Sequence, residues 1–307
     1  MQIVIVGAGA MGCLFGSLIA AAGEEVLLYD VDSTKVDKIN QNGITIIKKG
    51  EEPRKIMVKA VDSLDSVDPQ NLFILLVKSY QTERAAREIS LISNEKTSVL
   101  TLQNGFGNVE EICKYLPSKQ VFAGVTYQSA TELAPGKIYH TGSGLTIVAP
   151  LLKESMPIAM EQARLFNNCS ITAGATSGLE AISWKKLIIN SAINPLAALY
   201  GVENGKLPKN PEAVRDMAAL VVEGVAVAQK VGIPLDYGEI WASLLETCRR
   251  TAENKASMLA DVEAGRITEI QAINGSIINI GERHGVDTPT NLRMLRSVVA
   301  IHGGRGL

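Results

Sequence analysis

One apolar stretch of the chain carries polar side chains at a spacing that suits carbonyl chemistry. Within residues 184–195, Lys186, Asn190 and Asn194 recur every four positions, so they share one face of a helix. A lysine ammonium there can stabilise negative charge on an oxygen and donate a proton, while neutral amides hold a substrate without competing for that proton. A solvated helix face is the alternative, although two asparagines are unusual there because they are poor helix formers. Pro195 is expected to kink the helix and to free backbone carbonyls.

Further candidates for chemistry follow towards the C-terminus. Asn254 precedes Ser257, and Glu269 precedes Asn274 in a predicted helix. Taken alone, Ser257 is best interpreted as the N-cap of the helix that starts there, and Glu269 as an acid in the first turn of a helix.

The N-terminal stretch has the pattern of a dinucleotide-binding turn. Residues 2–6 form a short apolar run typical of a buried strand, and Gly7, Gly9 and Gly12 lead from it into a helical pattern over 11–22. Gly7 permits a tight turn, Gly9 allows the backbone to approach a pyrophosphate, and Gly12 lets the helix pack closely on the strand. A turn without a ligand is the alternative, but the position directly after a strand favours dinucleotide binding.

Polar residues also follow the next predicted strands. Residues 25–29 end at Asp30, 23 positions after Gly7, close to where an NAD-binding unit places a carboxylate on the adenosine ribose. A carboxylate there would repel the extra phosphate of NADP; Asp32 is the competing candidate, and a solvated turn acid is the alternative. Lys78 follows a buried strand at 71–77 and is placed to reach a phosphate or ribose, unless it is an exposed loop lysine.

The elements that must position these residues change character near residue 177. Before it, strands alternate with helices at 34–40, 82–92 and 157–167. We expect a strand pair from 44–48 and 55–59, strands at 98–102, 122–127, 145–149 and 171–173, and a hairpin at 136–144. A second glycine-rich loop, 103–108, is expected to close over the nicotinamide half of a cofactor, with an ordinary Asn-Gly turn as the alternative. From 178 onward we expect only helices, at 178–201, 211–230, 237–250, 257–264, 268–284 and 288–302.

Composition excludes several classes of function. The net charge of −2 and the absence of a Lys/Arg block argue against nucleic-acid binding. No apolar run approaches the roughly 20 residues that span a bilayer, and the N-terminus lacks the basic region of a signal peptide. The four cysteines have no CxxC spacing and are expected to be reduced thiols in a cytoplasmic protein, and the three scattered histidines indicate no metal site.

Taken together, these stretches resemble the ketopantoate reductase (2-dehydropantoate 2-reductase) family of the 6-phosphogluconate dehydrogenase-like group. The matching motifs are GAGAMG (7–12), VKSYQT (77–82), LQNGFGN (102–108), GVTY (124–127), HTGSG (140–144), WKKLIINSAINPL (184–196), AENKASML (252–259) and TEIQAING (268–275). They occur in order over nearly the whole chain. The helix with Lys186, Asn190 and Asn194 is their most diagnostic part.

The resemblance implies an α/β N-terminal Rossmann domain with a mostly parallel sheet at 1–177, an all-helical substrate and catalytic domain at 178–307, and an active site in the cleft between them. It implies that Lys186 is the catalytic lysine and that Glu269 is the essential acid. It assigns substrate or nicotinamide contacts to Asn104, Asn190, Asn194 and Ser257, with Asn254 as a weaker contact. The implied cofactor-binding residues are Gly7, Ala8, Gly9, Ala10, Met11, Gly12, Asp30, Lys78, Gln81, Asn104, Gly105, Thr126 and Glu269.

The expected reaction is NAD(P)H-dependent reduction of 2-oxopantoate to (R)-pantoate in pantothenate and coenzyme A biosynthesis, by a cytoplasmic enzyme that needs no metal. The better-known members use NADPH and carry a basic residue after the second strand, where this chain has Asp30; charge alone therefore predicts NADH. The alternatives are an NAD-dependent (R)-2-hydroxy-acid dehydrogenase for another 2-oxo acid and, more remotely, a non-catalytic nicotinamide sensor. The Ala- and Val-rich helical domain could supply the face of a homodimer.

Overall fold

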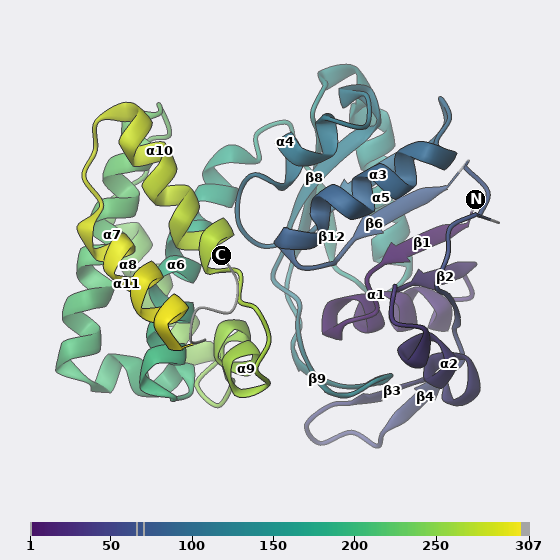
Figure 1. Ribbon diagram of the computed structural model, residues 1–307, viewed down its shortest axis with the longest axis horizontal. Coiled ribbons are helices and arrows are strands. Elements are labelled where there is room, and N and C mark those ends of the chain that lie inside the picture. Colours follow the sequence, from purple (N-terminus) through teal and green to yellow (C-terminus); the bar gives the residue numbers. More distant parts are fainter. Residues whose placement is uncertain (1, 66, 70, 302–307) are drawn as a thin grey trace. The chain divides into compact units, whose positions relative to one another are not determined.

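The structure is a computed structural model that describes residues 2–65, 67–69 and 71–301. Backbone contacts divide the chain into two compact units (Figure 1). The first comprises Met1–Gln103 and Asn108–Leu179, and the second comprises Asn104–Gly107 and Glu180–Leu307. The short loop Asn104–Gly107 therefore packs with the second unit, although the first unit surrounds it in sequence.

The first unit contains two sheets. Its strands are β1 (Ile3–Val6), β2 (Val26–Tyr29), β3 (Ile44–Ile47), β4 (Arg54–Ile56), β5 (Lys59–Val61), β6 (Leu72–Leu75), β7 (Ser98–Thr101), β8 (Val121–Thr126), β9 (Ser129–Ala134), β10 (Lys137–Gly142), β11 (Thr146–Pro150) and β12 (Ala173–Ala175). The larger sheet has the order β12-β11-β8-β7-β6-β1-β2-β5, and the smaller has the order β4-β3-β10-β9. Among the described residues, the strand pairs of the larger sheet are parallel except for β8 with β11.

Helices cover both faces of the larger sheet. They are α1 (Ala10–Ala21), α2 (Ser33–Asn42), α3 (Thr82–Ile92), α4 (Asn108–Cys113) and α5 (Met156–Asn168). Alternate residues of β1 enter different cores: Ile3 and Ile5 pack with α1 and α5, while Val4 and Val6 pack with α3 and α4. Burial on both faces explains why this strand is apolar throughout. The fold is the expected Rossmann-like α/β domain with a mostly parallel sheet.

The smaller sheet corrects two expectations. Residues 136–144 do not form a hairpin by themselves; β10 pairs antiparallel with β9, and the turn at Gly136 joins the two. The expected pairing of 44–48 with 55–59 is confirmed as β3 with β4, but Lys59 begins β5, which joins the larger sheet beside β2. Strand β9 was not expected because its sequence, SATELA, mixes polar residues with small ones.

The second unit is helical around one apolar core. Its helices are α6 (Glu180–Tyr200), α7 (Pro211–Lys230), α8 (Tyr237–Arg250), α9 (Ser257–Glu263), α10 (Ser276–His284) and α11 (Pro289–Ile301), and a π-helical turn, Gln271–Gly275, precedes α10. These bounds confirm the helices expected from the sequence to within a few residues. Helix α6 continues through Pro195. No helix in the described part of the chain is long and apolar enough to cross a membrane.

Candidate active site

The glycine turn between β1 and α1 is closed on one side and open on the other. Gly7 has a φ of +102°, and a Cβ on Gly12 would lie 1.8 Å from the carbonyl oxygen of Gly7, so neither position accepts a side chain. A Cβ on Gly9 would meet nothing within 4 Å, and Gly9, Ala10 and Met11 remain partly exposed although Ala8 is buried. This shape fits a dinucleotide, since it leaves the N-terminal N–H groups of α1 beside open space where a pyrophosphate can approach.

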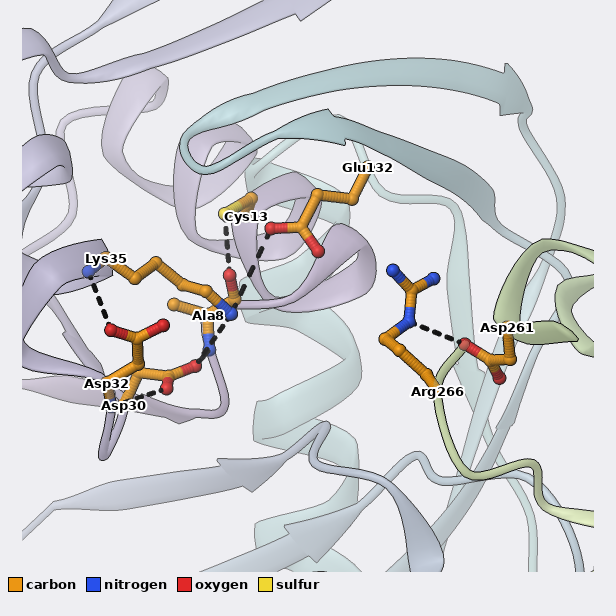
Figure 2. A network of polar contacts seen from close by, with 8 residues as sticks. All are labelled: Ala8, Cys13, Asp30, Asp32, Lys35, Glu132, Asp261 and Arg266. Carbon is orange, nitrogen blue, oxygen red and sulfur yellow. Dashed lines mark hydrogen bonds and ion pairs between the residues drawn. The ribbon is translucent and has the colours of Figure 1, made fainter. Parts of the chain in front are cut away.

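Asp30 is tied to this turn. Its carboxylate accepts hydrogen bonds from the backbone N–H groups of Ala8 at 2.8 Å and Asp32 at 3.0 Å (Figure 2). Asp32, the competing candidate, is exposed and caps α2 by accepting a hydrogen bond from the N–H of Lys35 at 3.1 Å. Strands β1 and β2 run in parallel with Val6 opposite Tyr29, so the turn and Asp30 follow neighbouring strand ends.

Sequence reasoning missed the charges around Asp30. The ammonium nitrogen of Lys35 lies 3.5 Å from Oδ2 of Asp30 and 4.0 Å from Oε1 of Glu132 on β9 (Figure 2). The position of Lys35 on α2, five residues after Asp30, could have predicted its contact with Asp30. The contact with Glu132 could not be predicted, because strand β9 was not expected. Cys13 lies beneath the turn and donates its thiol to the carbonyl of Ala8 at 3.3 Å; burial raises its pKa to about 12, so the thiol is protonated at neutral pH.

Lys78 follows β6, which is parallel to β1 and ends beside it. Val77 fills the space next to Gly7. Lys78 is the residue after Val77 and therefore lies close to the glycine turn. Its backbone N–H donates to Oε1 of Gln81 at 3.3 Å. Thr126 differs, because it is buried and its hydroxyl pairs with that of Thr146 at 2.9 Å within the sheet. Any contact of Thr126 with a cofactor would compete with this pairing.

In the helical unit, the structure brings Lys186 and Glu269 together across 83 positions of sequence. Lys186 lies partly buried on α6, and Glu269 is buried directly before the π-helical turn. Desolvation by burial lowers the pKa of Lys186 to about 8, while the negative charge of Glu269 raises it. A partly buried lysine whose pKa is lowered to about 8 and that feels the charge of a buried acid is suited to proton donation.

The remaining substrate candidates lie on α6 and near the start of α9, which packs against α6. Asn194 is buried, and Asn190 is partly exposed on the same face of α6 as Lys186. Asn254 precedes α9, and its carbonyl accepts a hydrogen bond from the N–H of Asn204 at 3.1 Å. The interpretation of Ser257 as an N-cap is wrong by one position, since Ala256 occupies the cap and Ser257 is the exposed first residue of the helix.

Two local contacts fix the surroundings of Glu269. The buried carboxylate of Asp261 on α9 accepts a hydrogen bond from Nε of Arg266 at 3.0 Å and so holds the segment leading to Glu269 (Figure 2). The loop Asn104–Gly107 packs on the π-helical turn, where the N–H of Phe106 donates to the carbonyl of Ala272 at 3.0 Å. Asn104 therefore belongs to the helical unit.

Among the described residues, no group of three or more His, Cys, Asp or Glu side chains could hold a metal ion.

Comparison with known proteins identifies the family of this chain. Residues 3–153 match the family model "Ketopantoate reductase PanE/ApbA", and residues 178–302 match the model of its C-terminal domain. The chain belongs to the ketopantoate reductase family. The 2-dehydropantoate 2-reductase of Pyrococcus horikoshii is 34% identical to this chain over 98% of it and 97% of the relative, and that of Archaeoglobus fulgidus is 31% identical over 99% and 98%.

Solved structures share the fold over nearly the whole chain. A ternary structure of D-mandelate dehydrogenase with NADH and anilino(oxo)acetate has a TM-score of 0.93 and 29% identity, with 99% of each chain covered. A PanE/ApbA family ketopantoate reductase from Ralstonia eutropha has a TM-score of 0.88 and 26% identity, also over 99% of each chain. The relatives are named as oxidoreductases of 2-hydroxy acids, and this chain is an oxidoreductase of that kind with a nicotinamide cofactor.

Proposed function

We propose that the protein reduces 2-oxopantoate to (R)-pantoate and that Lys186 is its proton donor. The observation that carries this proposal is that Lys186 and Glu269 both lie in the helical unit, where burial lowers the lysine pKa to about 8 and the charge of Glu269 opposes this shift. The curated relatives that match the whole chain are named 2-dehydropantoate 2-reductases, which supports the choice of substrate.

The reaction needs a proton and a stabilised oxygen. A reduced nicotinamide, when bound, would supply hydride to the ketone carbon, and negative charge would develop on the carbonyl oxygen. The Lys186 ammonium, hydrogen-bonded to that oxygen, stabilises the charge and transfers its proton as the alcohol forms. Glu269 keeps Lys186 protonated near neutral pH, since its charge opposes the effect of burial. Asn190 and Asn194 donate hydrogen bonds to the substrate from the same face of α6.

We propose the glycine turn, Asp30, Lys78 and Gln81 as the coenzyme site and NADH as the preferred coenzyme. Asp30 and Glu132 place carboxylate oxygens 3.5 and 4.0 Å from the ammonium of Lys35. The additional phosphate of NADPH would be repelled by these carboxylates, whereas the ribose hydroxyls of NADH can donate to Asp30. The better-known members of the family use NADPH. The proposed preference for NADH therefore depends on residues of this chain such as Asp30.

A second candidate is an NAD-dependent (R)-2-hydroxy-acid dehydrogenase for a bulkier substrate. The specific observation in its favour is the D-mandelate dehydrogenase structure with NADH, which superposes on this chain with a TM-score of 0.93. Both candidates use the same Lys186 and Glu269, and they differ in the side chain that the substrate pocket accepts.

One set of rate measurements tests these proposals. We would compare kcat/KM for 2-oxopantoate, phenylglyoxylate and 3-methyl-2-oxobutanoate, each with NADH and with NADPH. We expect 2-oxopantoate with NADH to give the highest value, and Lys186→Ala to lower kcat by about 100-fold or more. Preference for phenylglyoxylate would establish the second candidate. Coenzyme binding without turnover of any 2-oxo acid would overturn both and point to a sensor.

The coenzyme choice has its own variant. Asp30→Asn keeps an oxygen to accept the Ala8 N–H but removes the negative charge. We expect it to shift the ratio of kcat/KM for NADH to that for NADPH towards NADPH by about 10- to 100-fold. Asp32→Asn is the matched control, because Asp32 caps α2 and is exposed. An equal shift in both variants would refute the role of Asp30.

A further inference from the structure

A backbone carbonyl of α6 is bound by a side chain from a distant part of the helical unit. Pro195 has no N–H, so the carbonyl of Ser191, four residues earlier, lacks its usual helical donor. Nδ2 of Asn274 donates to that carbonyl at a distance of 3.0 Å. Helix α6 is thereby bonded, at the carbonyl that Pro195 leaves without a helical donor, to the segment that carries Glu269.

Asn274 lies in an unusual piece of helix. The π-helical turn Gln271–Gly275 begins two residues after Glu269, and the carbonyl of Glu269 accepts a hydrogen bond from the N–H of Ile273 at 3.0 Å. Single π-helical turns are rare and occur often at functional sites. Asn274 follows Glu269 by five residues, as Ser191 follows Lys186 by five. The hydrogen bond therefore joins the segment that carries Glu269 to the helix that carries Lys186.

The other contacts of Asn274 fix the orientation of its amide. Nδ2 also donates to Oδ1 of Asn291 at 3.0 Å, and Nδ2 of Asn291 donates to Oε2 of Glu223 on α7 at 2.8 Å. Glu223 accepts two backbone N–H groups at the start of α11 as well, at 2.7 and 2.9 Å. Asn274 and Asn291 are 0% exposed. These contacts hold Nδ2 of Asn274 towards Ser191, while Oδ1 of the same amide is buried without a hydrogen-bond partner among the described residues.

We propose that Asn274 is a positioning residue that sets the distance between Glu269 and Lys186 by bonding the π-helical turn to the carbonyl that Pro195 leaves open. The proposal rests on the functions proposed for Lys186 and Glu269. If the bond is lost, Glu269 is held less firmly near Lys186, and its charge raises the lysine pKa less. The measurable consequence is a lower pKa of Lys186.

The test begins with Asn274→Ala and its pH profile. We expect kcat to fall by about 10-fold or more. The basic limb of kcat/KM for 2-oxo acid reduction should move to lower pH by about half a unit to one unit. Ser276→Ala is the matched control, since the Ser276 hydroxyl donates at 2.8 Å to Ala272 of the same turn without reaching α6. We expect its basic limb to stay in place. An unmoved limb in Asn274→Ala, or an equal shift in Ser276→Ala, overturns the proposal.

A second variant separates positioning from stability. Pro195→Ala restores an N–H that can donate to the Ser191 carbonyl, so the double variant with Asn274→Ala has one unpaired buried group fewer. We expect the double variant to recover part of the melting temperature lost in Asn274→Ala, but not its pH profile. Recovery of both together would show that Asn274 acts only on stability. If Asn274→Ala does not fold, the similarly sized Asn274→Leu decides, because it also lacks the donor to the Ser191 carbonyl: a shift of the basic limb to lower pH supports the proposal, and an unmoved limb overturns it.

A readout without turnover keeps this proposal distinct from the proposed function. Reductive methylation with 13C-formaldehyde labels the lysines, and NMR titration then reports the pKa of Lys186, whose signal is assigned by its absence in Lys186→Met. We expect the titration midpoint to be lower in Asn274→Ala than in the unchanged protein. If no 2-oxo acid is reduced but this midpoint still moves, the proposed function fails while the positioning role stands. An unmoved midpoint refutes the positioning role.

Discussion

Replacing Lys186 by methionine should stabilise the protein while it abolishes turnover. Burial lowers the pKa of Lys186 from its ordinary value of 10.5 to about 8, since desolvation disfavours the ammonium. At pH 7 the folded protein carries this charge in a poorly solvated place, whereas the unfolded chain carries it in water. A difference of about 2.5 pKa units corresponds to about 3 kcal/mol, which is an upper value for a partly buried group.

The pH dependence has a definite sign. Because the folded-state pKa is the lower one, the destabilisation is fully present below pH 8 and disappears as the pH rises to about 10.5. Urea unfolding at pH 7 and at pH 10 measures it. We expect the free energy of unfolding of Lys186→Met to exceed that of the unchanged protein by up to about 3 kcal/mol at pH 7 and by much less at pH 10. Lys185→Met, on the same helix but off the polar stripe, is the control and should change little at either pH.

Two results would refute this reasoning. If Lys186→Met were no more stable than the unchanged protein at pH 7, the ammonium would not be desolvated in the folded state. If its advantage were the same at pH 7 and pH 10, the gain would come from packing and not from charge. In either case Lys186 would lose the physical basis for a pKa close to neutrality, and with it the reason to consider it a poised proton donor.

Three further variants test other parts of the site. Glu269→Gln removes the charge that raises the pKa of Lys186, so the basic limb of kcat/KM should move down by about one pH unit or more, and an upward shift would contradict the pairing. Gly12→Ala places a Cβ 1.8 Å from the Gly7 carbonyl oxygen, so NADH affinity measured by fluorescence titration should fall about 10- to 100-fold; unchanged affinity would show that the turn does not hold the coenzyme. Gly105 has a φ of +82°, and a Cβ there would crowd the backbone of Ala272. Urea unfolding of Gly105→Ala should therefore show a free energy of unfolding lower by about 1–3 kcal/mol. An unchanged free energy would mean that the loop adapts to the side chain.

Local signals made much of the fold predictable. Helices α7 and α8 have the bounds expected from the sequence because each begins at a strong cap: Asn210 accepts from the N–H groups of Glu212 and Ala213, and Asp236 accepts from that of Glu239. Apolar runs such as β1 and β6 were recognisable because burial on both sheet faces leaves no place for polar residues.

Contacts between distant segments were not predictable in the same way. The smaller sheet depends on the parallel pairing of β10 with β3, whose residues lie about ninety positions apart, and no local pattern specifies it. The same holds for the pairing of Lys35 with Glu132 and for the bond from Asn274 to Ser191. Glu269 shows the limit most clearly: alone it resembles any first-turn acid, and only the tertiary fold places it beside Lys186.

The helical unit is assembled from two pieces of chain that are not consecutive. Asn104–Gly107 belongs to it, and the N–H of Phe106 supplies a donor to the Ala272 carbonyl. A fragment starting at residue 178 would lack this donor and the Phe106 ring that packs edge-on against Trp184 at 5.2 Å. A hybrid gene with a single junction near that residue would likewise combine a loop from one parent with a π-helical turn from another. Successful exchange of the helical unit between relatives therefore requires the loop and the turn to be inherited together.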